Sequence, residues 1–298
     1  MKLAIDIGSN TIKCLLASPD GRGGVEKLYE ETLDSRICGA GNALVENAAA
    51  LVSSAVLHFV AEAKKRASEF ETVAVATSAL RDSPERGRVI DAVFAKTGVR
   101  VKILSGDEEA NLSYRGAMCG MRGNVDFSKE CVYFDLGGGS LELVCGDSEK
   151  VSLARSMPIG AVRLTRAFFD GAITPQKAEL AGEYVSGVLS ESAADFPKGS
   201  ALVGAGGAVS AARIMKARMN LGGEPAVITL EQMRKMADIA VAASPETLVK
   251  EYGIPAYRAD IIAAAFITIV RLCEFLGAES LTHTFFNLRY GIILEDIK

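Results

Sequence analysis

The sequence predicts an α/β fold built from two duplicated halves. Apolar runs typical of strands alternate with segments in which apolar residues recur at helical spacing. The 298 residues are enough for two domains of roughly 150 residues each. In addition, AIDIGSNTIKCLL near the start aligns without gaps on YFDLGGGSLELVC in the middle of the chain, so that Asp6 matches Asp135 and Gly8 matches Gly137.

The first half opens with two apolar runs in residues 2–17, and the break at Gly-Ser-Asn indicates a strand, a tight turn and a second strand. Val52, Val56 and Phe59 lie at helical spacing and predict an amphipathic helix over 44–70. The other elements predicted for this half are a strand over 72–77, a helix over 84–97 that Gly98 ends, a strand over 99–104 and a helix over 106–118.

The second half repeats this opening over residues 132–144. Three helix starts are predicted, at Thr174-Pro175, at Thr229 with Gln232 as its capping-box partner, and at Ser244-Pro245. A strand, glycine turn and helix are predicted over 201–214, and an almost wholly apolar helix over 258–277. The polar stretch 120–129 suggests the domain boundary, which gives one domain of 1–124 plus 288–298 and a second of 125–287.

Composition excludes several classes of protein. Hydrophobic residues make up 49% and charged residues 23%, as in a folded globular protein. A net charge of −4 leaves no broad basic field for duplex nucleic acid. Two histidines and no CxxC pair offer no zinc site, and cysteines inside apolar runs suggest a reducing cytoplasm. We expect no signal peptide and no membrane span, because Asp6 interrupts the first apolar run and Arg271 ends the longest one.

Two turns with the pattern Asp-x-Gly are the candidate phosphate-binding sites. Glycine lets a ligand approach the backbone, and successive amide N–H groups form an anion nest to which hydroxyls add donors. One such turn would be ordinary hairpin chemistry, but two aligned copies favour phosphate binding. The candidate phosphate-binding residues are Gly8, Ser9, Asn10 and Thr11 in the first turn and Gly137, Gly138, Gly139 and Ser140 in the second.

Asp6 and Asp135 end equivalent strands, and two carboxylates beside phosphate sites suit Mg²⁺ or another divalent cation. The alternative is that each Asp caps its own turn. Since domain interfaces favour binding sites, we expect the active-site cleft to lie between the two domains.

Other polar residues are ambiguous by themselves. Glu108 and Glu109 begin a helix, where acidic residues interact favourably with the helix dipole. Arg81 follows a buried strand and suits phosphate, but an isolated Arg there is more often a surface residue, and Arg289 has the same status. Glu142 lies inside a strand, where alternation can place it in solvent.

The motifs in combination resemble those of the Ppx/GppA phosphatase family, which contains exopolyphosphatases and guanosine pentaphosphate phosphohydrolases. The matching segments are AIDIGSNTIKCLLA, ATSALRDS, ILSGDEEANLSYRGA, YFDLGGGSLELV, SMPIGAVRLT, LVGAGGAVSA and the run from RADII at 258 to GIILE at 295. The resemblance implies two ribonuclease-H-like domains of the actin-like ATPase and sugar kinase superfamily, with an interdomain active-site cleft.

The resemblance also implies roles for particular residues. Glu109 matches the family's catalytic glutamate, Arg81 a phosphate-binding arginine, and Glu142 an acidic residue at the metal and water site. The implied reaction is hydrolysis of the terminal phosphoanhydride bond of polyphosphate in the cytoplasm, with Mg²⁺ and a homodimer as further expectations. Guanosine pentaphosphate (pppGpp) is the alternative substrate, and an actin-like ATP-binding kinase or a nucleotide-sensing module is the alternative from another class.

Two departures from the family pattern affect specificity. Asp82-Ser83-Pro84 follow Arg81, where the family usually has Asn. Near the end, THTFFNLRYG replaces the closing motif SDxGLREG; the Asp and Glu of that motif are missing, and only Arg289 and Gly291 remain. Longer relatives add helical domains beyond the two-domain core. We therefore expect a preference for short polyphosphate chains.

Overall fold

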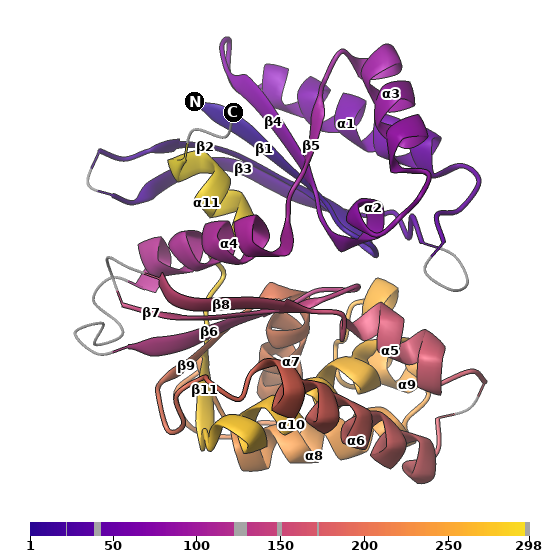
Figure 1. The fold of residues 1–298 in the computed structure, drawn as a ribbon, viewed down its shortest axis with the longest axis vertical. Coiled ribbons are helices and arrows are strands. Elements are labelled where there is room, and N and C mark those ends of the chain that lie inside the picture. The colour runs from indigo at the N-terminus through magenta and orange to yellow at the C-terminus, as the bar shows by residue number, and fades with distance from the viewer. Residues whose placement is uncertain (22, 39–42, 122–129, 148–150, 172, 296–298) are drawn as a thin grey trace. The chain divides into compact units, whose positions relative to one another are not determined.

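The computed structural model describes all residues except 22, 39–42, 122–129, 148–150, 172 and 296–298. Contacts divide the chain into two compact units, one of Met1–Arg122 with Phe286–Lys298 and one of Gly123–Phe285. Each unit is a sheet with helices packed against it (Figure 1). The predicted boundary between residues 124 and 125 lies outside the described residues.

The first unit is a five-stranded sheet of order β3-β2-β1-β4-β5. Strands β1 to β3 are antiparallel neighbours, whereas β4 and β5 run parallel to β1. Its elements are β1 (Lys2–Ile7), β2 (Thr11–Pro19), β3 (Val25–Asp34), α1 (Ala48–Lys64), β4 (Glu71–Ala76), α2 (Ser78–Arg81), α3 (Arg86–Thr97), β5 (Val101–Ile103), α4 (Gly106–Met121) and α11 (Leu288–Leu294).

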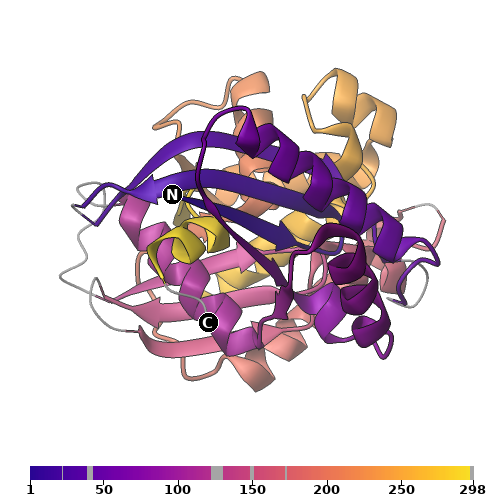
Figure 2. The ribbon, with the colours of Figure 1, turned by 90° about the horizontal axis from the view of Figure 1, so that it is seen from above.

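Both faces of this sheet are covered. Helices α1 and α3 pack on one face, where Val52, Val56 and Phe59 are fully buried, as their spacing predicts. Helices α4 and α11 cover the other face, and α11 packs against β1 and β2 (Figure 2). Helix α3 ends at Gly98, whose φ of +72° is the left-handed conformation that glycine adopts readily.

The second unit is a six-stranded sheet of order β10-β11-β9-β6-β7-β8. Strands β6 to β8 are antiparallel, and β9 and β11 run parallel to β6. Its elements are β6 (Cys131–Leu136), β7 (Leu141–Gly146), β8 (Val151–Met157), α5 (Ala161–Phe168), α6 (Pro175–Ser192), β9 (Leu202–Ala205), α7 (Gly206–Arg218), β10 (Val227–Thr229), α8 (Leu230–Ala242), α9 (Pro245–Lys250), the 3₁₀ helix η2 (Ala256–Arg258), α10 (Ile262–Leu276) and β11 (Ser280–His283).

The order β8-β7-β6-β9-β11 repeats the order β3-β2-β1-β4-β5 of the first unit, with β10 added at the edge. The same directions recur as well, since an antiparallel three-stranded meander precedes two parallel strands in both units. This confirms the α/β fold with two duplicated domains.

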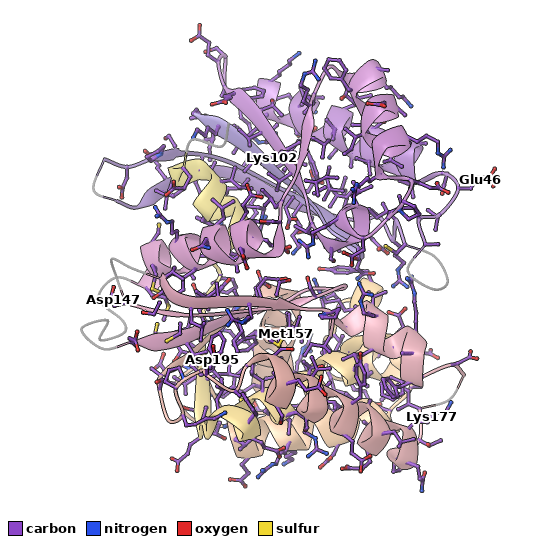
Figure 3. All side chains as sticks on the ribbon, in the orientation of Figure 1. Glu46, Lys102, Asp147, Met157, Lys177 and Asp195 are labelled. Atoms are coloured by element: carbon purple, nitrogen blue, oxygen red, sulfur yellow. The ribbon has the colours of Figure 1, made fainter. Side chains whose placement is uncertain are left out.

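One large apolar core connects the second sheet with α5 to α8 and α10. Met157 lies within the unit, while Lys177 and Asp195 lie at its outside (Figure 3). The expected helix starts are confirmed: the Thr174 hydroxyl accepts from the amide of Lys177, and Thr229 and Gln232 form a reciprocal capping box. Within the described residues, every helix is too short or too polar to cross a membrane.

Candidate active site

The first glycine turn connects β1 and β2 in a compact hairpin. The amide of Gly8 donates to the carbonyl of Thr11 at 3.1 Å, and the carbonyl of Asn10 accepts from the amides of Ser35 and Arg36 at 3.1 and 3.0 Å. Because these carbonyl oxygens accept hydrogen bonds within the unit, they do not face an approaching anion, and this suits an anion-binding nest of amides.

The second turn, between β6 and β7, closes in the same way, because the amide of Gly137 donates to the carbonyl of Ser140 at 3.0 Å. The carbonyls of this turn are also satisfied, here by the first amides of helix α5. Those bonds run from Ala161 to Gly137 at 3.0 Å, and from Val162 and Arg163 to Gly138 at 2.8 and 3.1 Å.

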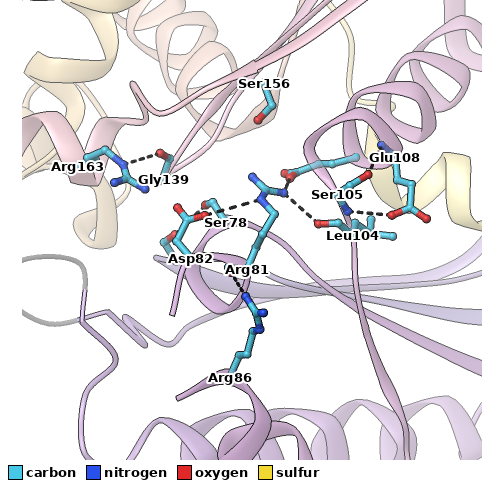
Figure 4. A network of polar contacts seen from close by, with 12 residues as sticks. Ser78, Arg81, Asp82, Arg86, Leu104, Ser105, Glu108, Gly139, Ser156 and Arg163 are labelled. Carbon is cyan, nitrogen blue, oxygen red and sulfur yellow. Dashed lines mark hydrogen bonds and ion pairs between the residues drawn. The ribbon is translucent and has the colours of Figure 1, made fainter. Parts of the chain in front are cut away.

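The segment before α5 holds the second turn in place. The Arg163 side chain donates from Nε to the carbonyl of Gly139 at 3.0 Å (Figure 4). A Cβ on Gly160 would lie 2.4 Å from the carbonyl carbon of Gly139 and from the amide nitrogen of Ser140. Any side chain at Gly160 would therefore displace the turn, which explains the glycine in the SMPIGAVRLT motif.

Asp135 and Glu142 face each other directly across the β6–β7 ladder. Glu142 is 2% exposed, and its Oε1 accepts from the Ser156 hydroxyl at 2.9 Å. On the other side, a Cβ on Gly206 would lie 2.3 Å from Oδ1 of Asp135, so the carboxylate packs against the turn that follows β9. Like charges directly opposite in a sheet destabilise it, and a bound cation relieves that repulsion.

The equivalent pair in the first unit has opposite charges. Asp6 faces Lys13 across the β1–β2 ladder, with Nζ 4.0 Å from Oδ2. The position that pairs with the aspartate is therefore a lysine, Lys13, in the first unit and a second carboxylate, Glu142, in the second. Sequence alignment of the two repeats already contained this contrast, since Lys13 matches Glu142.

Among the described residues, no group of three or more His, Cys, Asp or Glu side chains is placed to hold a metal ion. The opposed carboxylates of Asp135 and Glu142 nevertheless fit Mg²⁺, which often uses one or two protein carboxylates and completes its shell with water and substrate phosphate oxygens.

Arg81 and Glu109 form an ion pair within the first unit. Glu109, in the first turn of α4, is 7% exposed, and its Oε2 accepts from Nη1 of Arg81 at 2.6 Å. The same nitrogen donates to the carbonyl of Leu104 at 3.2 Å, and Nε of Arg81 lies 3.9 Å from Asp82. Two predicted site residues are therefore in direct contact, a pairing that their 28-residue separation in the sequence does not reveal.

Glu108 has a different environment from its neighbour. Its carboxylate accepts from the amide of Ser105 at 2.8 Å, the Ser105 hydroxyl accepts from the amide of Glu108 at 3.1 Å, and Lys102 lies 3.1 Å away. The Ser105 amide, followed by Lys102, lowers the pKa of Glu108. Glu108 therefore closes a capping box, while Glu109 contacts Arg81.

The sequence model of the Ppx/GppA phosphatase family matches residues 32–298. The chain belongs to this family. Exopolyphosphatase 1 of Mycobacterium leprae is 25% identical over 308 residues, which cover 100% of this chain and 90% of that protein. The guanosine-5'-triphosphate,3'-diphosphate pyrophosphatase of Aeromonas hydrophila is 29% identical over 65% of this chain and 38% of its own length.

A bifunctional 3-dehydroquinate synthase/phosphatase of Fusobacterium nucleatum is 25% identical over 77% of this chain, which spans only 35% of that relative. Among solved structures, an exopolyphosphatase of Cytophaga hutchinsonii superposes with a TM-score of 0.84 at 19% identity, covering 98% of this chain and 96% of the other. The Aquifex aeolicus Ppx/GppA protein gives 0.78 at 23% identity, with coverage of 98% and 96%. These structures show that the Ppx/GppA fold extends over nearly the whole chain.

Two arginines have positions that sequence reasoning did not assign. Arg258 is 9% exposed, and a Cβ on Gly207 would lie 1.8 Å from its Nη2, so the guanidinium packs against the glycine turn after β9. The matching segment beginning RADII was the available signal. Arg289, a weaker phosphate candidate, is buried instead, with Nη2 2.7 Å from Glu30 and Nη1 donating to the carbonyl of Cys14 at 2.9 Å. It connects α11 to β2 and β3.

Proposed function

We propose that this chain is an exopolyphosphatase that hydrolyses the terminal phosphoanhydride bond of inorganic polyphosphate and releases phosphate. The observation that carries the proposal is the Arg81–Glu109 pair: a nearly buried carboxylate at a helix start held by a guanidinium at 2.6 Å. The name of the M. leprae relative supports polyphosphate as the substrate.

In the proposed mechanism, Glu109 accepts a proton from the attacking water. Arg81 serves two partners in turn, because an arriving phosphate competes with the carboxylate for its guanidinium and leaves Glu109 available to the water. The turns at residues 8–11 and 137–140 are the proposed phosphate sites, with amides other than those of Gly8 and Gly137 as donors, because these two donate to the carbonyls of Thr11 and Ser140. Catalysis then depends mainly on positioning and charge stabilisation, as expected for phosphoryl transfer.

Asp135 and Glu142 are the proposed ligands of Mg²⁺, with Asp6 as the proposed ligand in the first unit. When bound, the cation offsets the negative charge of phosphate oxygens. Ser156 keeps the Glu142 carboxylate oriented through its hydroxyl. The Arg258 guanidinium beside Gly207 is a further proposed contact for phosphate.

A second candidate substrate is pppGpp, which the name of the A. hydrophila relative supports. We also propose a cytoplasmic location, since all six cysteines are free thiols. A homodimer remains a proposal from the family resemblance, and sedimentation velocity of the purified chain tests it.

Phosphate release tests the function directly. Tripolyphosphate, long-chain polyphosphate, pppGpp and ATP are compared at equal terminal-phosphate concentration with Mg²⁺ and with excess EDTA. We expect Mg²⁺-dependent release, faster from short than from long polyphosphate. Release from none of the four substrates would refute the proposal that the chain is a phosphohydrolase. Release that persists in excess EDTA would refute the proposed requirement for a divalent cation.

A further inference from the structure

The peptide groups of the second turn have an orientation that follows from the bonds of their carbonyl oxygens. The carbonyls of Gly137 and Gly138 accept from amides in the first turn of α5. The next carbonyl, that of Gly139, accepts from Nε of Arg163, which lies in the same turn of that helix, at 3.0 Å. These consecutive carbonyl oxygens therefore all point toward the start of α5.

The amides of the turn point the other way. In a trans peptide, the carbonyl of one residue and the N–H of the next residue lie on opposite sides of the bond that joins them. The N–H groups of Gly138, Gly139 and Ser140 therefore point away from α5. Within the part of the chain that the structure describes, only the Gly137 amide of this turn donates to another backbone group. Consecutive amides that share one direction form an anion nest.

The Gly139 carbonyl differs from its counterpart in the first unit in the kind of donor it accepts from. The repeat aligns Gly139 with Asn10, whose carbonyl accepts from the backbone amides of Ser35 and Arg36 at 3.1 and 3.0 Å. Glycine has no Cβ to restrict its backbone, so hydrogen bonds must set the orientation of the peptide that follows Gly139. In the second unit that bond comes from a side chain, and a substitution of Arg163 can remove it.

We propose that Arg163 is a positioning residue for phosphate, because its bond to the Gly139 carbonyl turns the amide of Ser140 toward the anion that the second turn binds. A backbone N–H that donates to a phosphate oxygen makes a charge-assisted hydrogen bond, which is stronger than one between neutral groups. The guanidinium then acts through the peptide group and not by an ionic contact with the substrate. This inference rests on the proposed function, because it assigns the way in which the second turn holds a substrate phosphate.

Two substitutions separate positioning from an ionic contact. Gln and Arg both carry a nitrogen directly after Cβ, Cγ and Cδ, so Arg163→Gln can place an N–H donor where Nε lies, without the charge. Arg163→Met has a flexible side chain of similar length and no N–H donor. If Arg163 acts through the Gly139 peptide, Arg163→Gln keeps phosphate binding and Arg163→Met weakens it. An ionic contact with phosphate would be lost in both variants.

The experiment measures binding of inorganic phosphate without metal or turnover. Protein labelled with ¹⁵N-serine is titrated with inorganic phosphate in EDTA, and the Ser140 amide resonance, assigned by comparison with Ser140→Ala, is followed. We expect this resonance to move in the wild type and in Arg163→Gln, with Kd values within a few-fold of each other. Arg163→Met should bind phosphate roughly 10- to 150-fold more weakly, as expected for loss of one hydrogen bond to a charged group.

Arg155 on β8 supplies a matched control for the loss of an arginine. Its Nη1 donates to the carbonyl of Ala154 at 2.8 Å, so Arg155→Met also removes an exposed bond from a guanidinium to a backbone carbonyl in the same unit. Arg155→Met should leave the Kd for phosphate unchanged. Thermal unfolding shows whether each variant is folded. If Arg163→Met does not fold, Arg163→Ala takes its place, because Ala has the higher helix propensity.

The outcomes distinguish this inference from the proposed function. Equal loss of phosphate binding in Arg163→Gln and Arg163→Met would assign an ionic contact, and an unchanged Kd in Arg163→Met would show that the bond to Gly139 is not needed. A Ser140 resonance that phosphate does not move in the wild type would remove that amide from the site. Each of these results overturns the proposal, even if the wild type hydrolyses tripolyphosphate. If the wild type releases phosphate from no substrate, the proposed function fails, while the titration still decides how the turn binds phosphate.

Discussion

Replacing Glu142 by Gln should make the metal-free protein more stable and its response to Mg²⁺ weaker. Glu142 faces Asp135 across the β6–β7 ladder and is 2% exposed, so two carboxylates lie directly opposite one another. Gln has nearly the same shape, and its Oε1 can still accept from the Ser156 hydroxyl. The substitution therefore removes one negative charge and changes little of the packing.

Directly opposed like charges in a sheet cost about 0.2–1 kcal/mol relative to a neutral pair. A change of 1 kcal/mol shifts the melting temperature of a unit of this size by about 2–4 °C, so metal-free Glu142→Gln should melt about 0.4–4 °C higher than wild type. Mg²⁺ at 100 times its Kd stabilises the wild type by about 2.7 kcal/mol, or about 5–10 °C. Most of that gain should disappear in the variant.

The assay is thermal unfolding in EDTA and in increasing Mg²⁺. For the measurement in EDTA, Asp6→Asn is the charge control at the duplicated position, because Asp6 faces Lys13 and not a second carboxylate. Its metal-free form should melt slightly below wild type, the opposite sign from Glu142→Gln. If Glu142→Gln melts lower in EDTA, or if it gains as much from Mg²⁺ as the wild type, the opposed carboxylates do not form a cation site.

Arg81→Ala should raise KM and also lower kcat, because the guanidinium contacts Glu109 as well as the proposed phosphate. Steady-state kinetics at two ionic strengths should show that KM of the variant depends less on salt than KM of the wild type. An unchanged KM would remove Arg81 from the site. Arg289→Ala should lower the free energy of unfolding in urea by about 1.5–3 kcal/mol, because the contacts of the buried guanidinium with Glu30 and with the Cys14 carbonyl are lost while Glu30 keeps Lys27 at 3.0 Å. The kcat/KM of the folded fraction should stay the same, and a large loss of kcat/KM without loss of stability would contradict this. Because burial, followed by the nearby Arg213, lowers the pKa of His283 to about 4 in the folded state, the unfolded chain binds a proton first as pH falls, and stability should drop by about 2 kcal/mol between pH 7 and 5, a drop that His283→Gln should largely remove.

Local sequence signals predicted the first strands, the repeat and most helices correctly. Each is specified by a short pattern, such as the Thr229 and Gln232 capping box, which forms in the structure as expected. Strand β3 was not predicted, although its residues alternate between half-buried and exposed over much of its length, because six of its ten residues are polar and it lies at the sheet edge. Short strands β10 and β11 gave too little periodicity to distinguish them from loops.

For the candidate site, the sequence identified residue types and motifs but not their partners. The Arg81–Glu109 contact depends on how α2 and α4 pack around the parallel strands β4 and β5, a long-range property. The burial of Arg289 against Glu30 likewise follows from the return of α11 to the first sheet.

The role of Glu109 as general base is tested most directly by the kcat of two isosteric variants on one polyphosphate substrate with Mg²⁺. Glu109→Gln keeps an oxygen for Arg81 but cannot accept a proton, whereas Glu108→Gln can still close the capping box with Ser105. We predict that Glu109→Gln lowers kcat by roughly 10²- to 10⁴-fold, as general-base catalysis contributes, while Glu108→Gln stays within a few-fold of wild type. Equal losses in the two variants, or a Glu109→Gln enzyme with most of its kcat, would contradict the assignment and point to Glu142 as the base.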